Sequence, residues 1–346
     1  MYQHGGNVFF QKSCIDFSAN INFLGIPDSV MSAARSGLTA AVHYPQEYNG
    51  TLSEHIAQWE SVRPEHVFCG NGASEIIRTL AQVLRPKKAL LPAPGFEEYT
   101  RSLAAVECGI TYYYTKESAG FRIPLDDFCA HITQETDVVF LCNPNNPTAV
   151  LYDRAFLEAV LARCEDMHAV LILDECFLDF VEDAPQRTMR KEDASRSLFI
   201  IKAFTKIFAM PGIRLGYGLC TDAGLMENLR QAVQPWNVST VAQRAGIACT
   251  KEAAFVRKTM QETAKERAWL LEKMEQAGIA GAHGEANFIF FKSRPGLHPF
   301  SIMRGIMLRD CSNFEGLTPG YYRVAVRSRQ ENKKLVEVLE QWQNQS

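Results

Sequence analysis

Three residues between positions 174 and 218 place an acid, a base and a guanidinium in loops that flank apolar runs. Asp174 ends the run LILD, Lys206 lies in AFTKIF, and Arg214 lies in PGIRLGYG. Pyridoxal phosphate (PLP) chemistry uses such a set: a lysine forms a Schiff base, a carboxylate pairs with the protonated ring nitrogen, and an arginine binds the phosphate. Each residue alone is more simply interpreted as a solvated edge charge or a helix cap. Only their combination favours this chemistry.

The composition is that of a globular chain without a strong excess of either charge. The chain has 346 residues, 47% hydrophobic and 22% charged, and a formal net charge of -3 from 36 basic and 39 acidic side chains. This length predicts two domains, or one large domain with an appendage. Because no long basic run occurs, we expect small polar ligands rather than nucleic acid or an acidic membrane surface.

Targeting and cysteine patterns favour a cytoplasmic location. The N-terminal sequence MYQHGGNVFFQKSCIDF lacks a basic region followed by an apolar stretch, and no apolar run reaches the roughly 18 residues of a membrane span. Ten cysteines are scattered between Cys14 and Cys311, without a C-x-x-C pair or a cysteine-histidine cluster of metal-ligand spacing. We therefore expect reduced cysteines in a reducing cytosol and no metal site.

Strand-like and helix-like segments alternate from residue 51 onward, which predicts an α/β fold. Apolar runs at 66–69, 88–92, 110–114, 137–142 and 169–174 indicate strands, and amphipathic segments with helical periodicity separate most of them. Such a pattern predicts a mainly parallel sheet covered on both faces. Ligands bind these sheets outside the carboxyl ends of the strands, where GNGASE, APGFEEY, NPNNPT and DECF all fall. One cleft is expected to collect these loops.

The pattern changes after Pro235-Trp236. A long helical stretch from about 239 to 276 precedes the strand-like NFIFFK, a helix near 298–305, the strand-like YYRVAVR and the amphipathic helix ENKKLVEVLEQW. We therefore expect a large cofactor-binding domain at residues 41–235. A smaller α/β domain is expected from residues 1–40 together with 236–346.

Each loop at the expected cleft has a simpler interpretation beside the functional one. The turn from Gly70 to Glu75 precedes a helix whose free N–H groups favour a phosphate, but an ordinary capped glycine turn explains it as well. It is not a convincing dinucleotide fingerprint, because Glu75 replaces the third glycine. NPNNPT is rigid turn chemistry, yet Asn146 can donate to a ligand oxygen near Asp174. Phe96 can stack on a heterocycle, although a lone phenylalanine is more often core.

These motifs, in this order and at these intervals, resemble the fold-type I PLP enzymes of the class I/II aminotransferase superfamily over essentially the whole chain. That resemblance implies a large domain with a mainly parallel sheet between helices, plus a smaller α/β domain. Within the superfamily, the chain resembles the L-threonine O-3-phosphate decarboxylases of cobalamin biosynthesis, with the histidinol-phosphate aminotransferases as wider relatives. The similar segments are HGGN at 4–7, DFSANIN, YPQEY, GNGASE, PGFEEY, CNPNNPT, ILDECFLDF, PGIRLGY and YYRVAVRS.

The resemblance implies a role for each residue of a cofactor site. Lys206 would form the Schiff base and Asp174 would hold the ring N–H, and these two are the implied catalytic residues. Phe96 would stack on the ring and Asn146 would contact its 3-oxygen. The full implied cofactor set is Gly72, Ala73, Ser74, Phe96, Asn146, Asp174, Thr205, Lys206 and Arg214, with Tyr44 reaching the cofactor phosphate of the other subunit in a homodimer.

Two positions depart from the family pattern. The usual Ser/Thr-x-Ser/Thr-Lys run reads Ala203-Phe204-Thr205-Lys206, so one hydroxyl that commonly touches the cofactor phosphate is missing. Such a charge-assisted hydrogen bond contributes roughly 1.5 to 3 kcal/mol, so the cofactor is held more weakly unless another group substitutes. Phe177 stands where many histidinol-phosphate aminotransferases have a tyrosine that bonds the ring 3-oxygen. This difference favours the decarboxylases.

The resemblance also implies a site for a phosphorylated amino acid. Arg323 would clamp the substrate α-carboxylate, for which a guanidinium offers bidentate geometry. Arg309 and Arg327 add positive charge, and His4 lies on a glycine-bearing N-terminus that could fold over the site; surface ion pairs and a disordered tail are the simpler interpretations. The implied substrate-binding residues are His4, Gly6, Asn20, Asn146, Arg309, Arg323 and Arg327.

The implied reaction is decarboxylation of L-threonine O-3-phosphate to (R)-1-aminopropan-2-yl phosphate and CO2. The alternatives are a decarboxylase of L-serine phosphate, an aminotransferase such as histidinol-phosphate aminotransferase, and a catalytically silent protein of the same fold. Intact Lys206 and Asp174 argue against the silent protein. The remaining reactions use the same ring, acid and lysine, so the sequence separates them poorly.

Overall fold

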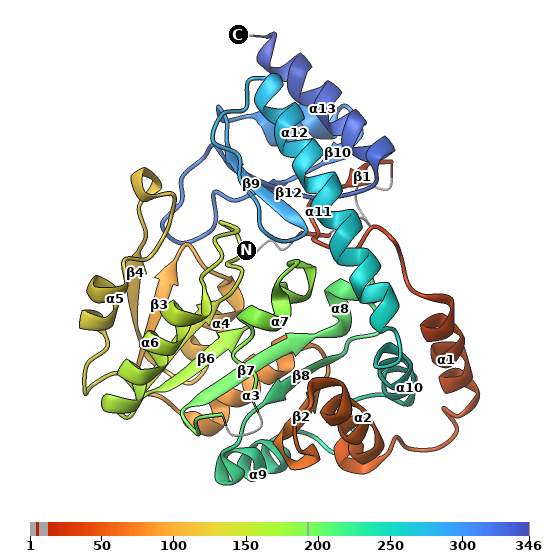
Figure 1. Ribbon diagram of the computed structural model, residues 1–346, viewed down its shortest axis with the longest axis vertical. Helices are drawn as coiled ribbons and strands as arrows, with labels where there is room; N and C mark the ends of the chain where they lie inside the picture. The colour runs from red at the N-terminus through yellow and green to blue at the C-terminus, as the bar shows by residue number, and fades with distance from the viewer. Residues whose placement is uncertain (1–4, 7–12, 192–193, 346) are drawn as a thin grey trace.

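A seven-stranded sheet runs through the larger part of the computed structural model, which describes residues 5–6, 13–191 and 194–345 (Figure 1). The strand order is β2-β8-β7-β6-β5-β3-β4, and only β8 runs antiparallel to its neighbours. The expected α/β fold with a mainly parallel sheet is therefore confirmed. The strands are β2 Val67–Gly70, β3 Lys88–Ala93, β4 Gly109–Tyr114, β5 Val138–Cys142, β6 Val170–Asp174, β7 Leu198–Ala203 and β8 Gly216–Leu219.

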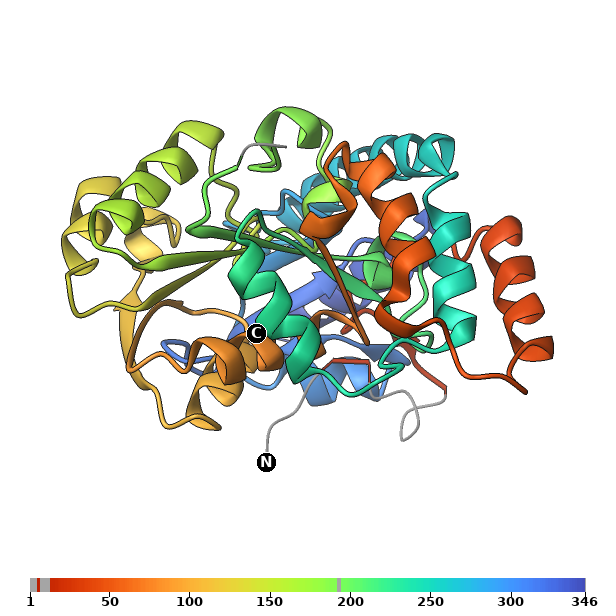
Figure 2. The same ribbon diagram turned by 90° about the horizontal axis from the view of Figure 1, so that it is seen from below.

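Helices cover both faces of this sheet because its central strands are apolar on both sides. Val139 and Leu141 of β5 pack in one hydrophobic cluster with α2, α5, α6 and α10, whereas Phe140 packs in another with α3, α4 and α9. Figure 2 shows the two helical layers on opposite sides of the sheet. The bounds are α2 Gly50–Glu60, α3 Ala73–Leu84, α4 Glu97–Ala104, α5 Leu125–His131, α6 Arg154–Asp166, α9 Ala223–Ala232 and α10 Thr240–Cys249, with short helices α7 Ala184–Arg187 and α8 Phe204–Ile207.

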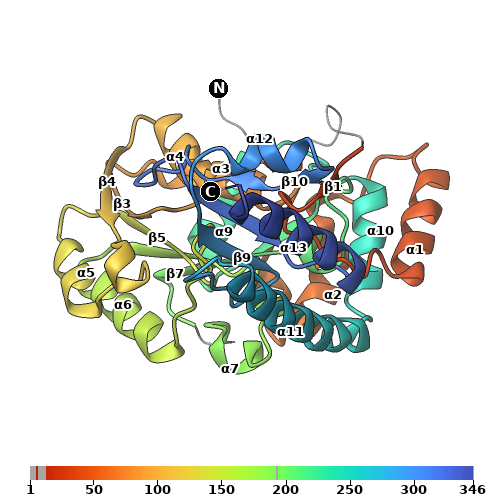
Figure 3. The same ribbon diagram turned by 90° about the horizontal axis from the view of Figure 1, so that it is seen from above.

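A smaller α/β part lies above the large sheet in the view of Figure 1, and Figure 3 looks down on it. It contains the antiparallel sheet β11-β12-β9 and a two-stranded parallel sheet in which the N-terminal β1 pairs with β10. Its elements are β1 Ile15–Asp16, α11 Ala253–Gln276, β9 Phe288–Lys292, α12 Leu297–Ile302, β10 Ile306–Met307, β11 Arg309–Asp310, β12 Tyr321–Ala325 and α13 Arg329–Gln343; α1 Asp28–Thr39 packs on α10. The domain boundaries at 40/41 and 235/236 stay a prediction.

The long helix expected at 239–276 is two helices, α10 and α11. Ser239 caps the start of α10 by accepting a hydrogen bond from the Ala242 N–H at 3.2 Å. At its end, the Thr250 hydroxyl donates to the Ile247 carbonyl at 2.8 Å, a local bond that competes with helix continuation. The chain therefore turns between Cys249 and Ala253, which apolar periodicity alone does not reveal.

A buried ion cluster fixes β7 just before the segment that holds Lys206. The Lys202 ammonium lies 3.2 Å from Glu60 and 3.0 Å from Asp179, and the Tyr217 hydroxyl of β8 donates to Glu60. Burial alone raises the pKa of Glu60, but Lys202 and Arg190 hold it below its usual value. These charges tie α2, β7 and β8 together beneath the site.

Within the described residues, no helix is long and apolar enough to cross a membrane. The same residues include no cluster of three histidine, cysteine or acidic side chains that could hold a metal ion. All ten cysteines are free thiols.

Candidate active site

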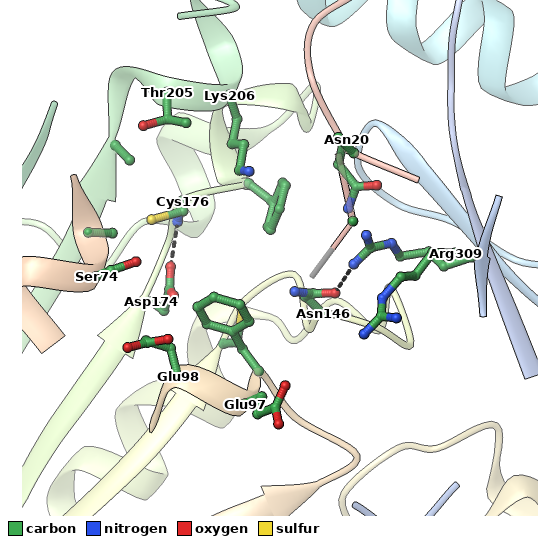
Figure 4. A pocket seen from close by; sticks show the side chains of 18 of the residues that line it. Asn20, Ser74, Glu97, Glu98, Asn146, Asp174, Cys176, Thr205, Lys206 and Arg309 are labelled. Atoms are coloured by element: carbon green, nitrogen blue, oxygen red, sulfur yellow. Dashed lines mark hydrogen bonds between the residues drawn. The ribbon is translucent and has the colours of Figure 1, made fainter. Parts of the chain in front are cut away.

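A hollow of about 350 Å³ opens at the carboxyl ends of β5, β6 and β7, below the smaller α/β part. Side chains from both parts of the protein surround it (Figure 4). The cleft expected from the strand-end loops therefore exists. Of the residues expected in the site, those that line it are Asn20, Ala73, Ser74, Phe96, Asn146, Asp174, Thr205, Lys206, Arg214, Arg309 and Arg323.

The other expected residues lie beside the hollow or away from it. Gly72 lies under the Arg214 guanidinium, and the Gly6 N–H donates to the Ser18 hydroxyl at 2.7 Å, while neighbouring Gly5 lines the hollow. Arg327 does not line it and instead binds the Asp16 carbonyl at 3.0 Å and Glu331 at 2.8 Å. His4 lies outside the described residues.

Tyr44 lies on the surface, away from the hollow of its own chain. Its side chain is 77% exposed and stacks on Trp236, with 4.2 Å between ring centroids. The resemblance assigned Tyr44 to the site of another subunit, so its exposure here leaves that assignment a prediction.

Lys206 projects from α8, the short helix that follows β7, and its half-buried side chain lines the hollow. Burial lowers the pKa of this amine to about 8, and the positive charges of Arg323 and Arg214 contribute to the shift. A lysine with this pKa has a substantial neutral fraction near neutral pH, as a nucleophilic amine requires.

Asp174 ends β6 and is 4% exposed. Its Oδ1 accepts a hydrogen bond from the Cys176 N–H at 2.9 Å, and its Oδ2 accepts one from the Tyr99 hydroxyl at 2.6 Å. Both donors favour the ionised carboxylate, which is the form that can hold a protonated ring nitrogen. Figure 4 shows Asp174 and Lys206 at the same hollow.

The turn before α3 forms a cradle for an anion. Gly72 has a φ of 81°, and a Cβ there would overlap the Arg214 guanidinium. On the other side, a Cβ at Gly216 would lie 2.6 Å from the Ala73 nitrogen. Glycines thus let β8 and the guanidinium approach the free N–H groups at the start of a twelve-residue helix, where a phosphate is favoured.

Two buried guanidiniums face each other across the register of β11 and β12, in which Arg309 pairs with Arg323. Arg323 donates to the Asn146 side-chain oxygen and to the Ser18 carbonyl at 2.7 Å, while Arg309 donates to the Asp310 carbonyl and the Asn313 side-chain oxygen, both at 2.8 Å. Burial lowers the pKa of Arg323 to about 10 and that of Arg309 below its usual value. Neither forms an ion pair with a carboxylate anywhere in the described chain.

The two departures from the family pattern both lie at the hollow. Ala203 lines it without a hydroxyl, and the neighbouring Thr205 hydroxyl donates to the Leu215 carbonyl at 3.4 Å. The Phe177 ring centroid is 5.9 Å from the Lys206 amine. Position 177 therefore provides an aromatic ring for packing and no hydroxyl.

Several residues at the hollow were not expected from the sequence. Glu97 and Glu98 line it, as do Cys176 and Phe314. Tyr99 reaches Asp174 from the same turn of α4. The sequence did hold one indication that Glu97, Glu98 and Tyr99 belong to the site, because they follow Phe96 within one helical turn.

The family assignment follows from a comparison of the whole chain with known proteins. The model of the family "Aminotransferase class I and II" matches residues 12–339. The chain belongs to this family. It is therefore a PLP-dependent enzyme, as the resemblance implied, and the cradle, the lysine of lowered pKa and the buried acid fit that cofactor.

Individual relatives cover nearly the full length. The chain is 33% identical to the threonine-phosphate decarboxylase of Salmonella typhimurium over 97% of its length and 95% of the relative's. It is 28% identical to the histidinol-phosphate aminotransferase of Methanocella arvoryzae, over 95% of this chain and 90% of that protein. Among solved structures, the histidinol-phosphate aminotransferase of Clostridium acetobutylicum matches with a TM-score of 0.89 and 30% identity, covering 95% of this chain and 99% of that one.

Gly72→Ala should weaken PLP binding, because its Cβ overlaps the Arg214 guanidinium. We expect the dissociation constant to rise roughly tenfold or more, as for loss of a charge-assisted hydrogen bond. Titration of the apo-protein with PLP, followed by absorbance, measures this. Gly25→Ala is the matched control, because Gly25 has a φ of 79° but a Cβ there meets no other described atom within 4 Å. Unchanged affinity in Gly72→Ala would contradict the cradle.

The rate at which PLP attaches to the apo-protein should rise with pH through a midpoint near 8, the pKa of Lys206. Attachment needs the neutral amine, whose fraction grows as pH increases through the pKa. At pH 7 this pKa gives roughly 300 times more neutral amine than an ordinary lysine has. Stopped-flow absorbance measures the rate, and Lys206→Ala should show no attachment. A rate that keeps rising through pH 10 would contradict the lowered pKa.

Proposed function

We propose that the protein decarboxylates L-threonine O-3-phosphate to (R)-1-aminopropan-2-yl phosphate and CO2, with PLP as cofactor, as a step of cobalamin biosynthesis. The 33% identity to a threonine-phosphate decarboxylase supports the reaction. Further support comes from a 28% identical relative named adenosylcobalamin biosynthesis bifunctional protein, although the chain matches only 40% of that longer protein.

The observation that carries this proposal is the pair Arg309 and Arg323. Both guanidiniums are buried without a carboxylate partner among the residues that the structure describes, and an unpaired buried charge is costly. A substrate with both a carboxylate and a phosphate supplies the missing negative charge and accepts bidentate hydrogen bonds from two guanidiniums. An amino acid phosphate therefore matches the charge that this pocket lacks.

Each residue of the hollow then has a defined task. When bound at Lys206, PLP supplies an electron-accepting ring for the electron pair of the broken Cα–carboxylate bond. Asp174 keeps a proton on the ring nitrogen, and Asn146 offers an amide to the ring 3-oxygen. Arg323 and Arg309 hold the acidic groups of the substrate and so orient the bond that breaks. The substrate amine would take the place of the Lys206 amine on the cofactor and give up its proton to that amine, and the freed Lys206 would return this proton to Cα after CO2 departs.

An aminotransferase is the second candidate, and the 30% identity to the histidinol-phosphate aminotransferase of Clostridium acetobutylicum supports it. Phe177 argues against it, because the hollow lacks the hydroxyl at this position. L-serine phosphate is an alternative substrate for decarboxylation, since one methyl group changes selectivity by only about 1 to 3 kcal/mol.

We further propose a homodimer that works in the cytoplasm. A run of exposed apolar side chains extends over Leu38, Val42, Tyr44 and Tyr48, and Trp236 stacks on Tyr44. Exposed apolar patches of this kind mark association surfaces. Pairing there would bury these side chains and allow Tyr44 to reach the other subunit's cofactor phosphate. The ten free thiols suit a reducing compartment.

The reaction is tested by incubating the holo-protein with L-threonine phosphate, L-serine phosphate or histidinol phosphate, each with and without 2-oxoglutarate. We expect CO2 and aminopropyl phosphate from L-threonine phosphate without any need for 2-oxoglutarate. Both CO2 and glutamate are measured in every reaction. Glutamate without CO2 would establish the aminotransferase instead.

Arg323→Ala and Arg309→Ala should each lower kcat/KM for L-threonine phosphate by at least roughly 100-fold, because each removes a charged partner of the substrate. PLP affinity should change far less, since neither residue belongs to the cradle. Steady-state kinetics and PLP titration measure the two effects. Arg304→Ala, at an exposed arginine that binds Gln341, is the control. Equal losses of turnover and PLP binding would place the pair outside the substrate site.

A further inference from the structure

Tyr99 is a buried tyrosine that contacts the acid of the site without lining the hollow. It is 3% exposed, and its hydroxyl donates to Asp174 Oδ2 at 2.6 Å. Its ring stacks on Phe140 of β5, with 4.8 Å between centroids, and meets the Phe96 ring edge-on at 5.5 Å. Tyr99 therefore packs against one implied cofactor residue and hydrogen-bonds to another.

The surroundings of Tyr99 fix the direction of its hydrogen bond. Burial raises the pKa of its hydroxyl well above the usual value, and the charge of Asp174 raises it further, so the hydroxyl keeps its proton. Cys142 and Cys176 face it as well, and burial raises the pKa of both thiols well above their usual range. The Tyr99 hydroxyl is thus always the donor of this hydrogen bond, and the Asp174 carboxylate is always the acceptor.

A carboxylate that accepts hydrogen bonds is stabilised in its charged form. In a buried site the carboxylate and the ring nitrogen of PLP compete for one proton, and a stabilised carboxylate leaves that proton on the ring. The Cys176 N–H occupies the other oxygen of Asp174, so Tyr99 and this backbone group together also fix the plane of the carboxylate. The tyrosine is rigidly held by its stacking, which makes it suited to that task.

We propose that Tyr99 is a positioning residue that orients Asp174 and keeps the proton on the ring nitrogen of PLP. This inference rests on the proposed role of Asp174 as the partner of that nitrogen. Loss of the hydroxyl weakens the electron-accepting character of the ring rather than the binding of the substrate.

The test compares Tyr99→Phe with Tyr113→Phe in the PLP-loaded protein. Tyr113 is the matched control because it is buried and its hydroxyl also donates to an aspartate, Asp127, at 2.5 Å, while neither of these residues lines the hollow. Both substitutions remove one hydroxyl and keep the ring. The pH midpoint of the visible absorbance band, the PLP dissociation constant, kcat and KM are measured for each.

In Tyr99→Phe, the absorbance midpoint should rise by roughly half a pH unit or more, because a less positive ring lets the Lys206 nitrogen retain its proton to higher pH. The PLP dissociation constant should rise and kcat should fall, each roughly tenfold, whereas KM for the substrate stays within about twofold. Tyr113→Phe should leave all four quantities unchanged. A general loss of structure would instead lower the apo-protein's melting temperature without moving the midpoint.

A second variant tests the same bond in the opposite direction. 3-Fluorotyrosine placed at position 99 keeps the ring and the hydroxyl but donates a stronger hydrogen bond, so the midpoint should fall. It also provides the test if Tyr99→Phe does not fold. If the visible absorbance band forms normally but its pH midpoint moves in neither variant, the proposed role of Tyr99 is overturned, while the role of Lys206 stands. A native protein that forms no such band with PLP overturns the role of Lys206, and this inference with it.

Discussion

The cost of burying positive charge distinguishes two lysines that lie four positions apart on one segment. Lys202 is buried and Lys206 is half-buried, but Lys202 has Glu60 and Asp179 as partners, which raise the pKa of its ammonium despite its burial. Lys206 has arginines nearby instead, and its pKa falls to about 8. The paired lysine holds β7 in place, whereas the unpaired one is available for chemistry. The whole site depends on this separation of structural charge from reactive charge.

The same principle separates the arginines of the smaller part. Arg327 and Arg329 lie in ion pairs with Glu331 and Glu266, whereas Arg309 and Arg323 have only neutral acceptors within the described chain. Overall fold does not distinguish a decarboxylase from an aminotransferase, because relatives of both kinds superpose on nearly the full chain. The charge that a pocket leaves unpaired is a better guide to the substrate than the arrangement of its strands.

Features that depend on neighbouring residues, such as strands and the loops at their ends, could be predicted from the sequence. Continuous apolar runs identified five strands of the central sheet, and their parallel order placed the loops of Asn146 and Asp174 at one edge. The bond between Tyr99 and Asp174 joins residues 75 positions apart, so no spacing rule reveals it. The resemblance implied Arg327 as an additional cation of the substrate site, but β12 ends at Ala325 and the chain turns toward α13. The sequence therefore did not predict contacts between residues far apart in the chain or the residues at which helices and strands end.

The cradle at the start of α3 depends on a strand that arrives late in the chain. Gly216 lies on β8, which inserts antiparallel between β2 and β7, so the turn at Gly72 acquires its second wall only once residue 216 is in place. The guanidiniums at 309 and 323 follow about a hundred residues later. During synthesis on the ribosome, the segment that holds the cofactor is therefore made in full before either arginine of the substrate pocket. The order of the chain thus separates synthesis of these cofactor-binding segments from synthesis of the two arginines.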